Sequence, residues 1–140
     1  MDNYIKVEIM SRSDNERLSR SIAAAFALSS DPTLEEINEI KTAVSEAVTN
    51  AIIHGYEDSE GIVCMECASC ANVITIKISD TGKGIENIDQ AMEPLYTGKP
   101  DSERTGLGFT IMQTFMDSVE VQSKKGEGTT VTMTKKIGTN

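Results

Sequence analysis

The sequence predicts an α+β fold: a two-layer α/β sandwich in which helices cover one face of a mixed, mostly antiparallel sheet. Two stretches with apolar residues every three or four positions predict helices in the first part of the chain. Two pairs of alternating stretches, each joined by a turn-forming segment, predict hairpins after them. Since hairpins pair antiparallel strands, the helices are expected to pack on one face of the sheet they form.

The first elements are a strand and a helix. Residues 4–9 alternate in polarity, and the apolar face of this predicted strand carries Ile5, Val7 and Ile9. Ser13 and Glu16 have the spacing of a capping box, in which Ser13 accepts the N3 amide and Glu16 bonds back to the cap. A helix is expected after this capping box, and Asp31-Pro32 ends it. Its apolar side carries Leu18, Ile22, Ala25 and Phe26.

The second helix is the best delimited element. Thr33 and Glu36 form another capping box at its start, and Gly55 is a natural C-cap at its end. Its apolar stripe consists of Ile37, Ile40, Val44, Ala47, Val48 and Ala51.

A hairpin and a long irregular stretch come next. Residues 61–68 and 73–79 predict paired strands around a turn near Ala71-Asn72. From residue 80 to residue 108 the chain is rich in glycine, proline and polar residues, with one helical turn expected near residues 88–92. So long an irregular stretch in a small domain indicates a functional loop.

The chain ends with a helix and a second hairpin. The helix is expected at residues 108–117. The strands are expected at residues 119–123 and 129–135, joined by the turn Lys125-Gly126-Glu127-Gly128.

Composition limits the class of protein. The chain has 140 residues, with 13 Lys and Arg against 22 Asp and Glu, and a net charge of −9. This length predicts a single domain over residues 1–140. The acidic balance argues against nonspecific nucleic-acid binding and against docking on an anionic membrane. No stretch is apolar enough to span a bilayer, and no secretory signal is apparent, so a cytoplasmic location is expected.

Three polar clusters are candidates for chemistry. The first is Glu46 and Asn50, which are four residues apart and therefore share a helix face. An amide oxygen suits Mg²⁺ beside phosphates, and a carboxylate can orient or deprotonate a nucleophile. An ordinary surface pair is the alternative.

The second cluster, Asp80-Thr81-Gly82-Lys83-Gly84, follows a predicted strand. Here an aspartate can accept a hydrogen bond from an exocyclic amine, and the glycines let the backbone approach a flat ring. A simple strand-ending turn is the alternative.

The third cluster, Arg104-Thr105-Gly106-Leu107-Gly108, opens a predicted helix. Free amides at a helix N-terminus suit phosphate groups. A flexible entry to a buried helix is the alternative.

The order of these clusters resembles the N, G1 and G2 boxes of the GHKL (Bergerat-type) ATP-binding superfamily, which includes gyrase, MutL proteins and histidine kinases. The chain has no room for the further domains of those members, and it most resembles the free-standing anti-sigma factor serine kinases. The runs 35–41, 45–56 and 108–112 are most similar to those of the sporulation anti-sigma F factors.

The resemblance implies a role for each matching residue. Asn50 is expected to hold Mg²⁺, and Glu46 to be the general base. Asp80 is expected to bind the adenine amine, with Gly82, Gly84 and Thr130 lining the adenine pocket. The phosphates of ATP are expected to be bound by Arg104, Thr105, Gly106, Leu107 and Gly108, at the end of a lid over about residues 85–105.

The resemblance also implies a function. The expected protein sequesters a sigma factor of the sigma F type from RNA polymerase and phosphorylates a serine of an anti-anti-sigma factor, using ATP and Mg²⁺. It is expected to be a homodimer. A stress-response anti-sigma kinase, a nucleotide-gated binding module without kinase activity, and a histidine-kinase catalytic domain are the alternatives.

The remaining candidate residues can be explained by ordinary structural or surface roles. Cys64, Cys67 and Cys70 have metal-like spacing, but a strand would turn residues three apart to opposite faces. His54 is expected to be structural, at a helix C-terminus. Arg20 lies on a basic helix face that is a candidate surface for a protein partner, although a solvated face is the simpler explanation.

Overall fold

A computed structural model describes residues 1–56, 59–82, 84 and 108–138. Its elements, in chain order, are β1 (Asn3–Met10), α1 (Ser13–Ala27), the 3-10 turn η1 (Leu28–Ser30), α2 (Leu34–Asn50), the π-helical turn η2 (Ala51–Gly55), β2 (Ile62–Cys70), β3 (Val73–Asp80), α4 (Gly108–Phe115), β4 (Ser118–Lys124) and β5 (Gly128–Lys136). The helical turn expected near residues 88–92 lies outside the described residues.

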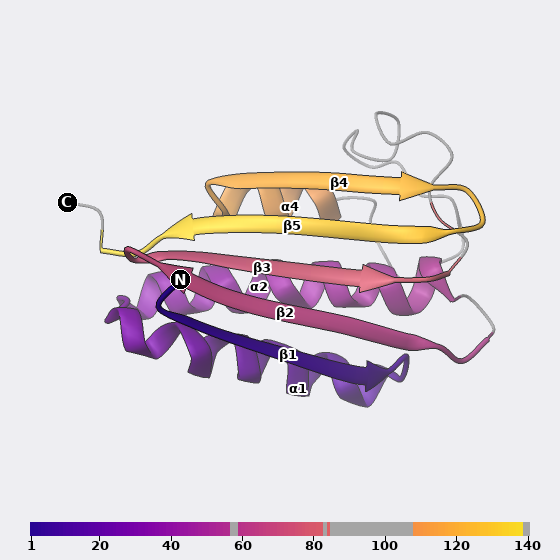
Figure 1. The fold of residues 1–140 in the computed structure, drawn as a ribbon, viewed down its shortest axis with the longest axis horizontal. Helices are drawn as coiled ribbons and strands as arrows, with labels where there is room; N and C mark the ends of the chain where they lie inside the picture. Colours follow the sequence, from indigo (N-terminus) through magenta and orange to yellow (C-terminus); the bar gives the residue numbers. More distant parts are fainter. Residues whose placement is uncertain (57–58, 83, 85–107, 139–140) are drawn as a thin grey trace.

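The five described strands form one sheet in the order β1-β2-β3-β5-β4, and every neighbouring pair is antiparallel. The helices α1, α2 and α4 all lie on the same face of this sheet (Figure 1). The predicted two-layer α+β architecture is confirmed, with no parallel pair among the described strands.

The hairpin between β2 and β3 turns where the sequence predicts it. Ala71 and Asn72 have φ values of 50° and 65°, so both central residues are left-handed, as a two-residue hairpin turn requires. The carbonyl of Asn72 accepts from the amide of Ile137 at 2.8 Å, which fastens this turn to the residue after β5.

The apolar stripe of α2 packs on the sheet as predicted. Its buried positions are Ile40, Ala43, Val44, Ala47 and Val48. They meet the helix-facing residues of the central strands, which include Met65, Ile76 and Met133, all 1% exposed or less. Burial of this stripe fixes which side of α2 turns outward, and therefore where Glu46 and Asn50 lie.

The predicted apolar side of α1 is partly wrong. Leu18 is 50% exposed and Ala25 is also exposed. The buried positions are instead Ser19, Ala23, Phe26 and Ala27. Three of these are small side chains, on a helix that packs against α2. Ser19 can be buried because its hydroxyl donates to the carbonyl of Asn15 at 2.7 Å.

The two predicted capping boxes have different outcomes. At α2, the Thr33 hydroxyl accepts from the Glu36 amide at 3.1 Å, and Glu36 accepts from the Thr33 amide at 2.9 Å, so this box is confirmed. At α1 the box is absent: the cap residue is Arg12, without a side-chain cap bond. Glu16 instead accepts from the hydroxyl of Ser45 on α2 at 2.7 Å, because packing between the helices provides another partner.

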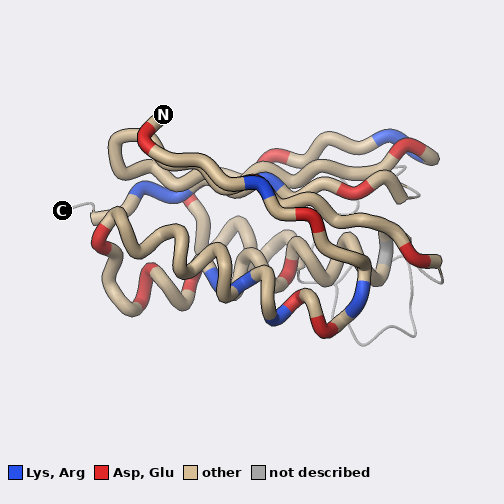
Figure 2. Tube along the Cα trace, turned by 60° about the horizontal axis from the view of Figure 1, so that its bottom comes forward, with Lys and Arg blue, Asp and Glu red and all other residues tan. Residues whose placement is uncertain are grey.

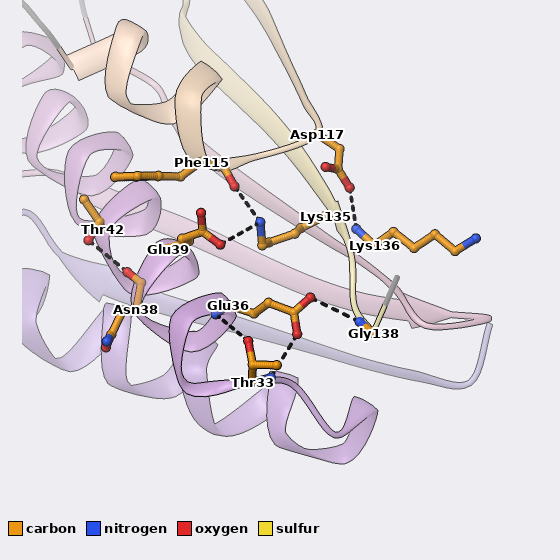
Figure 3. A network of polar contacts seen from close by, with 10 residues as sticks. All are labelled: Thr33, Glu36, Asn38, Glu39, Thr42, Phe115, Asp117, Lys135, Lys136 and Gly138. Atoms are coloured by element: carbon orange, nitrogen blue, oxygen red, sulfur yellow. Dashed lines mark hydrogen bonds and ion pairs between the residues drawn. The ribbon is translucent and has the colours of Figure 1, made fainter. Parts of the chain in front are cut away.

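A polar network joins α2, α4 and β5 (Figure 3). Lys135 is only 8% exposed, and its ammonium donates to the carbonyl of Phe115 at 2.7 Å and pairs with Glu39 at 3.2 Å. Glu36 also accepts from the amide of Gly138 at 3.1 Å. The end of α4 and the segment after β5 are therefore both tied to α2.

Charged residues are spread over both layers of the molecule (Figure 2). Within the described part of the chain, no helix has the combination of length and apolar composition that crossing a membrane requires. Over the described part of the chain, basic residues therefore lie among the acidic ones.

Candidate functional site

Three segments that are distant in sequence meet at one end of the sheet. They are the end of η2 at Gly55, the end of β3 at Asp80, and the start of β5, where Thr129 is the register partner of Asp80. η2 contacts both β3 and β5. The predicted clusters around Asn50 and Asp80 are thus joined through the residue that ends η2.

Asp80 is a buried carboxylate with specific donors. It is 9% exposed, and its Oδ1 accepts from the Gly82 amide at 2.9 Å. Burial raises the pKa of the Asp80 carboxyl, while the backbone amides of Gly82 and Thr129 oppose this by donating to it. Such a group accepts a hydrogen bond from a ligand amine with unusual strength, because little water competes for it.

Glycines surround this carboxylate because neighbouring groups occupy the space that a side chain would need. A Cβ atom on Gly55 would lie 2.9 Å from Asp80 Cγ, and one on Gly82 would overlap the carbonyl of Gly55. Gly128, with φ +104°, lies against the carbonyl of Asp80 in the same way. The close approach of these backbones holds Asp80 in one place.

Gly84 lies close to a different segment, the end of β4. Its φ of +76° favours glycine, and a Cβ atom there would overlap the carbonyl of Lys124 at the end of β4. Gly82 and Gly84 therefore allow backbone to meet backbone, beside any role in admitting a flat ring.

The structure does not bring Thr130 together with Asp80. The side chain of Thr130 donates to the hydroxyl of Ser79 at 3.3 Å, on the face of the sheet that points away from the helices. Thr129, one residue earlier, is on the helix-facing side with Asp80, and its hydroxyl contacts that of Ser123 at 2.8 Å. The register thus places Thr129 rather than Thr130 on the same side of the sheet as Asp80, and the role of Thr130 in an adenine pocket stays a prediction.

Glu46 and Asn50 lie one turn apart on α2, and both are partly buried. Asn50 is the last residue of α2, directly before η2. The two side chains therefore lie on the helix that leads into the Asp80 site, where an amide oxygen and a carboxylate can serve a hard cation and a nucleophile.

The phosphate-binding cluster is described only in part. Gly108 is buried at the first position of α4, as predicted. Arg104, Thr105, Gly106, Leu107 and the lid at about residues 85–105 lie outside the described residues.

The sequence analysis did not assign three residues to this site: Gly55, Tyr56 and Thr129. Gly55 was predicted as a helix cap, but its role is to give Asp80 room. Tyr56, the next residue, is 8% exposed and bonds through its hydroxyl to Thr81, beside Asp80. For Thr129, alternation counted back from Val131 and Met133 would have indicated the helix-facing side.

The cysteines do not form a metal site. Cys67 faces the core, where burial raises its pKa to about 12, while Cys70 is exposed. No group of three or more metal-ligating side chains is found among the residues that the structure describes. Arg20 is partly exposed and pairs with Glu16 at 3.6 Å, so it lies on an accessible face of α1.

Comparison with known proteins finds one matching family model and several relatives with similar sequences. A family model described as a histidine kinase-like ATPase domain matches residues 9–135. The chain is 57% identical over 137 residues to the anti-sigma F factor of Clostridium beijerinckii, and the alignment covers 97% of this chain and 96% of the relative. It is 54% identical over 140 residues to the anti-sigma F factor of Clostridium perfringens, which covers 99% and 100%.

A solved structure has a similar fold. It contains the RsbU and RsbW domains of a Mycobacterium tuberculosis protein and aligns with a TM-score of 0.70 at 17% identity. The alignment covers 96% of this chain and 32% of that one. At this identity the likeness concerns the fold alone.

Proposed function

The chain belongs to the histidine kinase-like ATPase domain family, and from this premise we propose that it is an anti-sigma factor with serine kinase activity. It binds a sigma factor of the sigma F type and keeps it from RNA polymerase. It also phosphorylates a serine of an anti-anti-sigma factor, with ATP and Mg²⁺. The observation that carries this proposal is the buried Asp80 carboxylate. The relatives that align with this chain over nearly their whole length are named anti-sigma F factors.

The donor set fits an adenine nucleotide. Oδ1 of Asp80 accepts from the Gly82 amide, and the carboxyl also receives the Thr129 amide. Because the two carboxylate oxygens together have about four lone-pair sites, the group can still accept from the exocyclic amine of adenine. Thr129 and Ser123 place two hydroxyls on the same side of the sheet. In this proposal Gly82 and Gly84 shape the pocket, and the segment from Arg104 to Gly108 binds the phosphates.

The residues of α2 provide the chemistry. Asn50 supplies an amide oxygen to Mg²⁺, which when bound neutralises charge on the phosphates. Glu46 accepts the proton of the incoming serine hydroxyl. The serine oxygen forms a bond to the γ-phosphorus as the bond from that phosphorus to the bridging oxygen breaks, and ADP leaves.

The partner surface includes Arg20 on α1. The Arg20 side chain is 36% exposed and pairs with Glu16 at 3.6 Å, so part of it is accessible to a partner. The proposal includes a homodimer in the cytoplasm, where sigma factors act. The test is Arg20→Ala in a pull-down with the sigma factor while ATP turnover is followed, with Arg17→Ala on the same helix as the control; unchanged binding by Arg20→Ala contradicts this surface.

The kinase proposal is tested by transfer of labelled phosphate from ATP to a purified anti-anti-sigma protein. The expected product is acid-stable phosphoserine, whereas an acid-labile product indicates a histidine kinase. Glu46→Gln should lower the rate by about 100-fold or more while ATP still binds. Glu120→Gln, an exposed change on β4, is the matched control.

Other outcomes separate the alternatives. Full transfer by Glu46→Gln shows that Glu46 is not the base. Binding of the sigma factor with ATP but no transfer by the wild type indicates a nucleotide-gated module. Preference for a stress-response sigma factor over sigma F moves the assignment to that class.

A further inference from the structure

Tyr56 follows η2 and is buried against a glycine. The residue is 8% exposed. A Cβ atom on Gly61 would overlap the Tyr56 ring, so the absence of a side chain at Gly61 makes room for it. The ring therefore has one position, set by the chain just before β2.

The hydroxyl of Tyr56 uses its full hydrogen-bonding capacity. It donates to the carbonyl of Ile62 at 2.6 Å and accepts from the amide of Thr81 at 2.9 Å. The hydroxyl of Thr81 lies 3.2 Å away. Because a phenol has one proton, which goes to Ile62, the Thr81 hydroxyl is the donor in this third contact.

These hydrogen bonds fix the position of Thr81, the residue between Asp80 and Gly82. Within the described residues, both hydrogen bonds of Thr81 go to the Tyr56 hydroxyl. Gly82 in turn donates its amide to Oδ1 of Asp80. Fixing Thr81 therefore fixes the donor that orients the carboxylate.

The same tyrosine fixes the opposite wall. Gly55, directly before Tyr56, lies against the Asp80 carboxyl, and its carbonyl lies where a Cβ of Gly82 would be. Tyr56 thus joins the end of η2 to the start of β2 and to the segment after β3. A shift of its hydroxyl would move both sides of the Asp80 carboxylate.

We infer that Tyr56 is a positioning residue that sets base selectivity: through Thr81 and Gly82 its hydroxyl holds Asp80 in the orientation that accepts from an exocyclic amine. This inference rests on the proposed nucleotide site. A base with a carbonyl at the corresponding position, as in guanine, presents an acceptor to the carboxylate and is rejected. Loss of the hydroxyl should therefore reduce discrimination as well as affinity.

Tyr56→Phe tests this directly, because phenylalanine keeps the ring beside Gly61. Kd values for ATP and GTP are measured by calorimetry, with folding checked by circular dichroism. The Kd for ATP should rise about tenfold, that for GTP should change much less, and the ATP preference should fall by a similar factor. In the kinase assay KM for ATP should rise more than kcat falls.

A second measurement needs no ligand. Amide hydrogen exchange at Thr81 in the free protein should become about tenfold faster in Tyr56→Phe. Tyr4→Phe is the matched control, because its hydroxyl bonds to Glu66 on the exposed surface at 3.0 Å, and it should leave both readouts unchanged.

The outcomes are distinct. If the wild type binds neither nucleotide, the proposed function is overturned and this inference with it. If the wild type prefers ATP and Tyr56→Phe keeps the same preference and exchange rate, only the role of Tyr56 is overturned. Equal weakening of ATP and GTP, or loss of the fold, also overturns it, because either result shows a purely structural residue.

Discussion

The carboxyl group of Asp80 lies directly against Gly55, so that a Cβ atom at Gly55 would be 2.9 Å from Asp80 Cγ. Gly55 ends η2 and Asp80 ends β3, so the contact joins the helical layer to the sheet. The contact leaves no space for any other residue at position 55 unless Asp80 moves.

Gly55→Ala should therefore impair ATP binding more than stability. Alanine has the higher helical propensity, but its methyl group displaces the Asp80 carboxylate. The Kd for ATP is expected to rise about tenfold or more. Gly126→Ala is the control: its Cβ enters open space at φ +83°, so it should cost about 1 kcal/mol of stability and leave the Kd unchanged. An unchanged Kd in Gly55→Ala contradicts this account.

Asp80→Asn should weaken ATP binding without weakening the fold at neutral pH. If the asparagine oxygen still accepts from the Gly82 amide, its NH₂ group points toward the adenine amine. Both of these groups are donors, so the hydrogen bond to adenine is lost. The Kd should rise by roughly 10- to 100-fold, as for a lost bond to a charged group. Asp117→Asn, which alters an exposed acceptor of the Lys136 amide, should leave the Kd unchanged.

The pH dependence of stability gives a second test of Asp80. Burial raises its folded pKa above the ordinary value of 3.8, so the folded protein holds this proton more tightly than the unfolded chain. The resulting stability is fully present below the unfolded pKa and is lost as the pH rises through the folded pKa. The Tm of Asp80→Asn relative to wild type should therefore increase from acidic to neutral pH; a decrease contradicts the raised pKa.

Two alanine substitutions distinguish the helix starts. Thr33→Ala should cost about 1 kcal/mol of unfolding free energy, because it breaks the bond to the Glu36 amide. Ser13→Ala should cost far less, since α1 has no side-chain cap bond. Urea denaturation of both variants measures the difference, and equal losses would show that Ser13 does cap α1 in solution.

Lys135→Met should destabilise the protein by about 2 kcal/mol, because Glu39 and the Phe115 carbonyl lose a buried donor. Adding Glu39→Gln should recover part of this loss, since the unpaired charge is then removed. Lys124→Met is the matched control: its pair with Glu127 is solvent-exposed and should contribute less than about 1 kcal/mol. Chemical denaturation curves give all three values.

The cysteines should differ in reactivity toward iodoacetamide. Cys67 is buried with its pKa raised to about 12, so almost no thiolate forms at pH 8. Cys70 is exposed and should react first, whereas Cys67 should react only after unfolding. Mass spectrometry of the peptides locates the label, and rapid labelling of Cys67 in the folded protein contradicts its burial.

Much of the fold could be predicted because its signals are local. The stripe of α2, the Thr33 capping box and the left-handed turn at Ala71-Asn72 each depend on residues close together in sequence. The spacing of the stripe lies within one helix, and the capping box and the turn depend on the backbone of neighbouring residues. These signals can therefore be read without knowing which distant segments pack against them.

The errors arise where a distant segment decides. Glu16 does not cap α1 because Ser45 on α2 takes its carboxylate. Gly55 is required by Asp80, which local helix rules do not consider. Thr129 and Thr130 differ only in which face of the sheet they occupy, and this follows from the register of β5 with β3.

The position of β5 has a consequence for how the protein is made. β5 is the last described strand along the chain, yet it lies inside the sheet between β3 and β4. During synthesis β1, β2 and β3 can pair first, but β3 keeps an open edge until β5 leaves the ribosome. Asp80 receives the Thr129 amide only at that moment. A nascent chain that stops before β5 therefore leaves the edge of β3 unpaired and has an incomplete Asp80 site, so the capacity to bind nucleotide is acquired only after β5 has been synthesised.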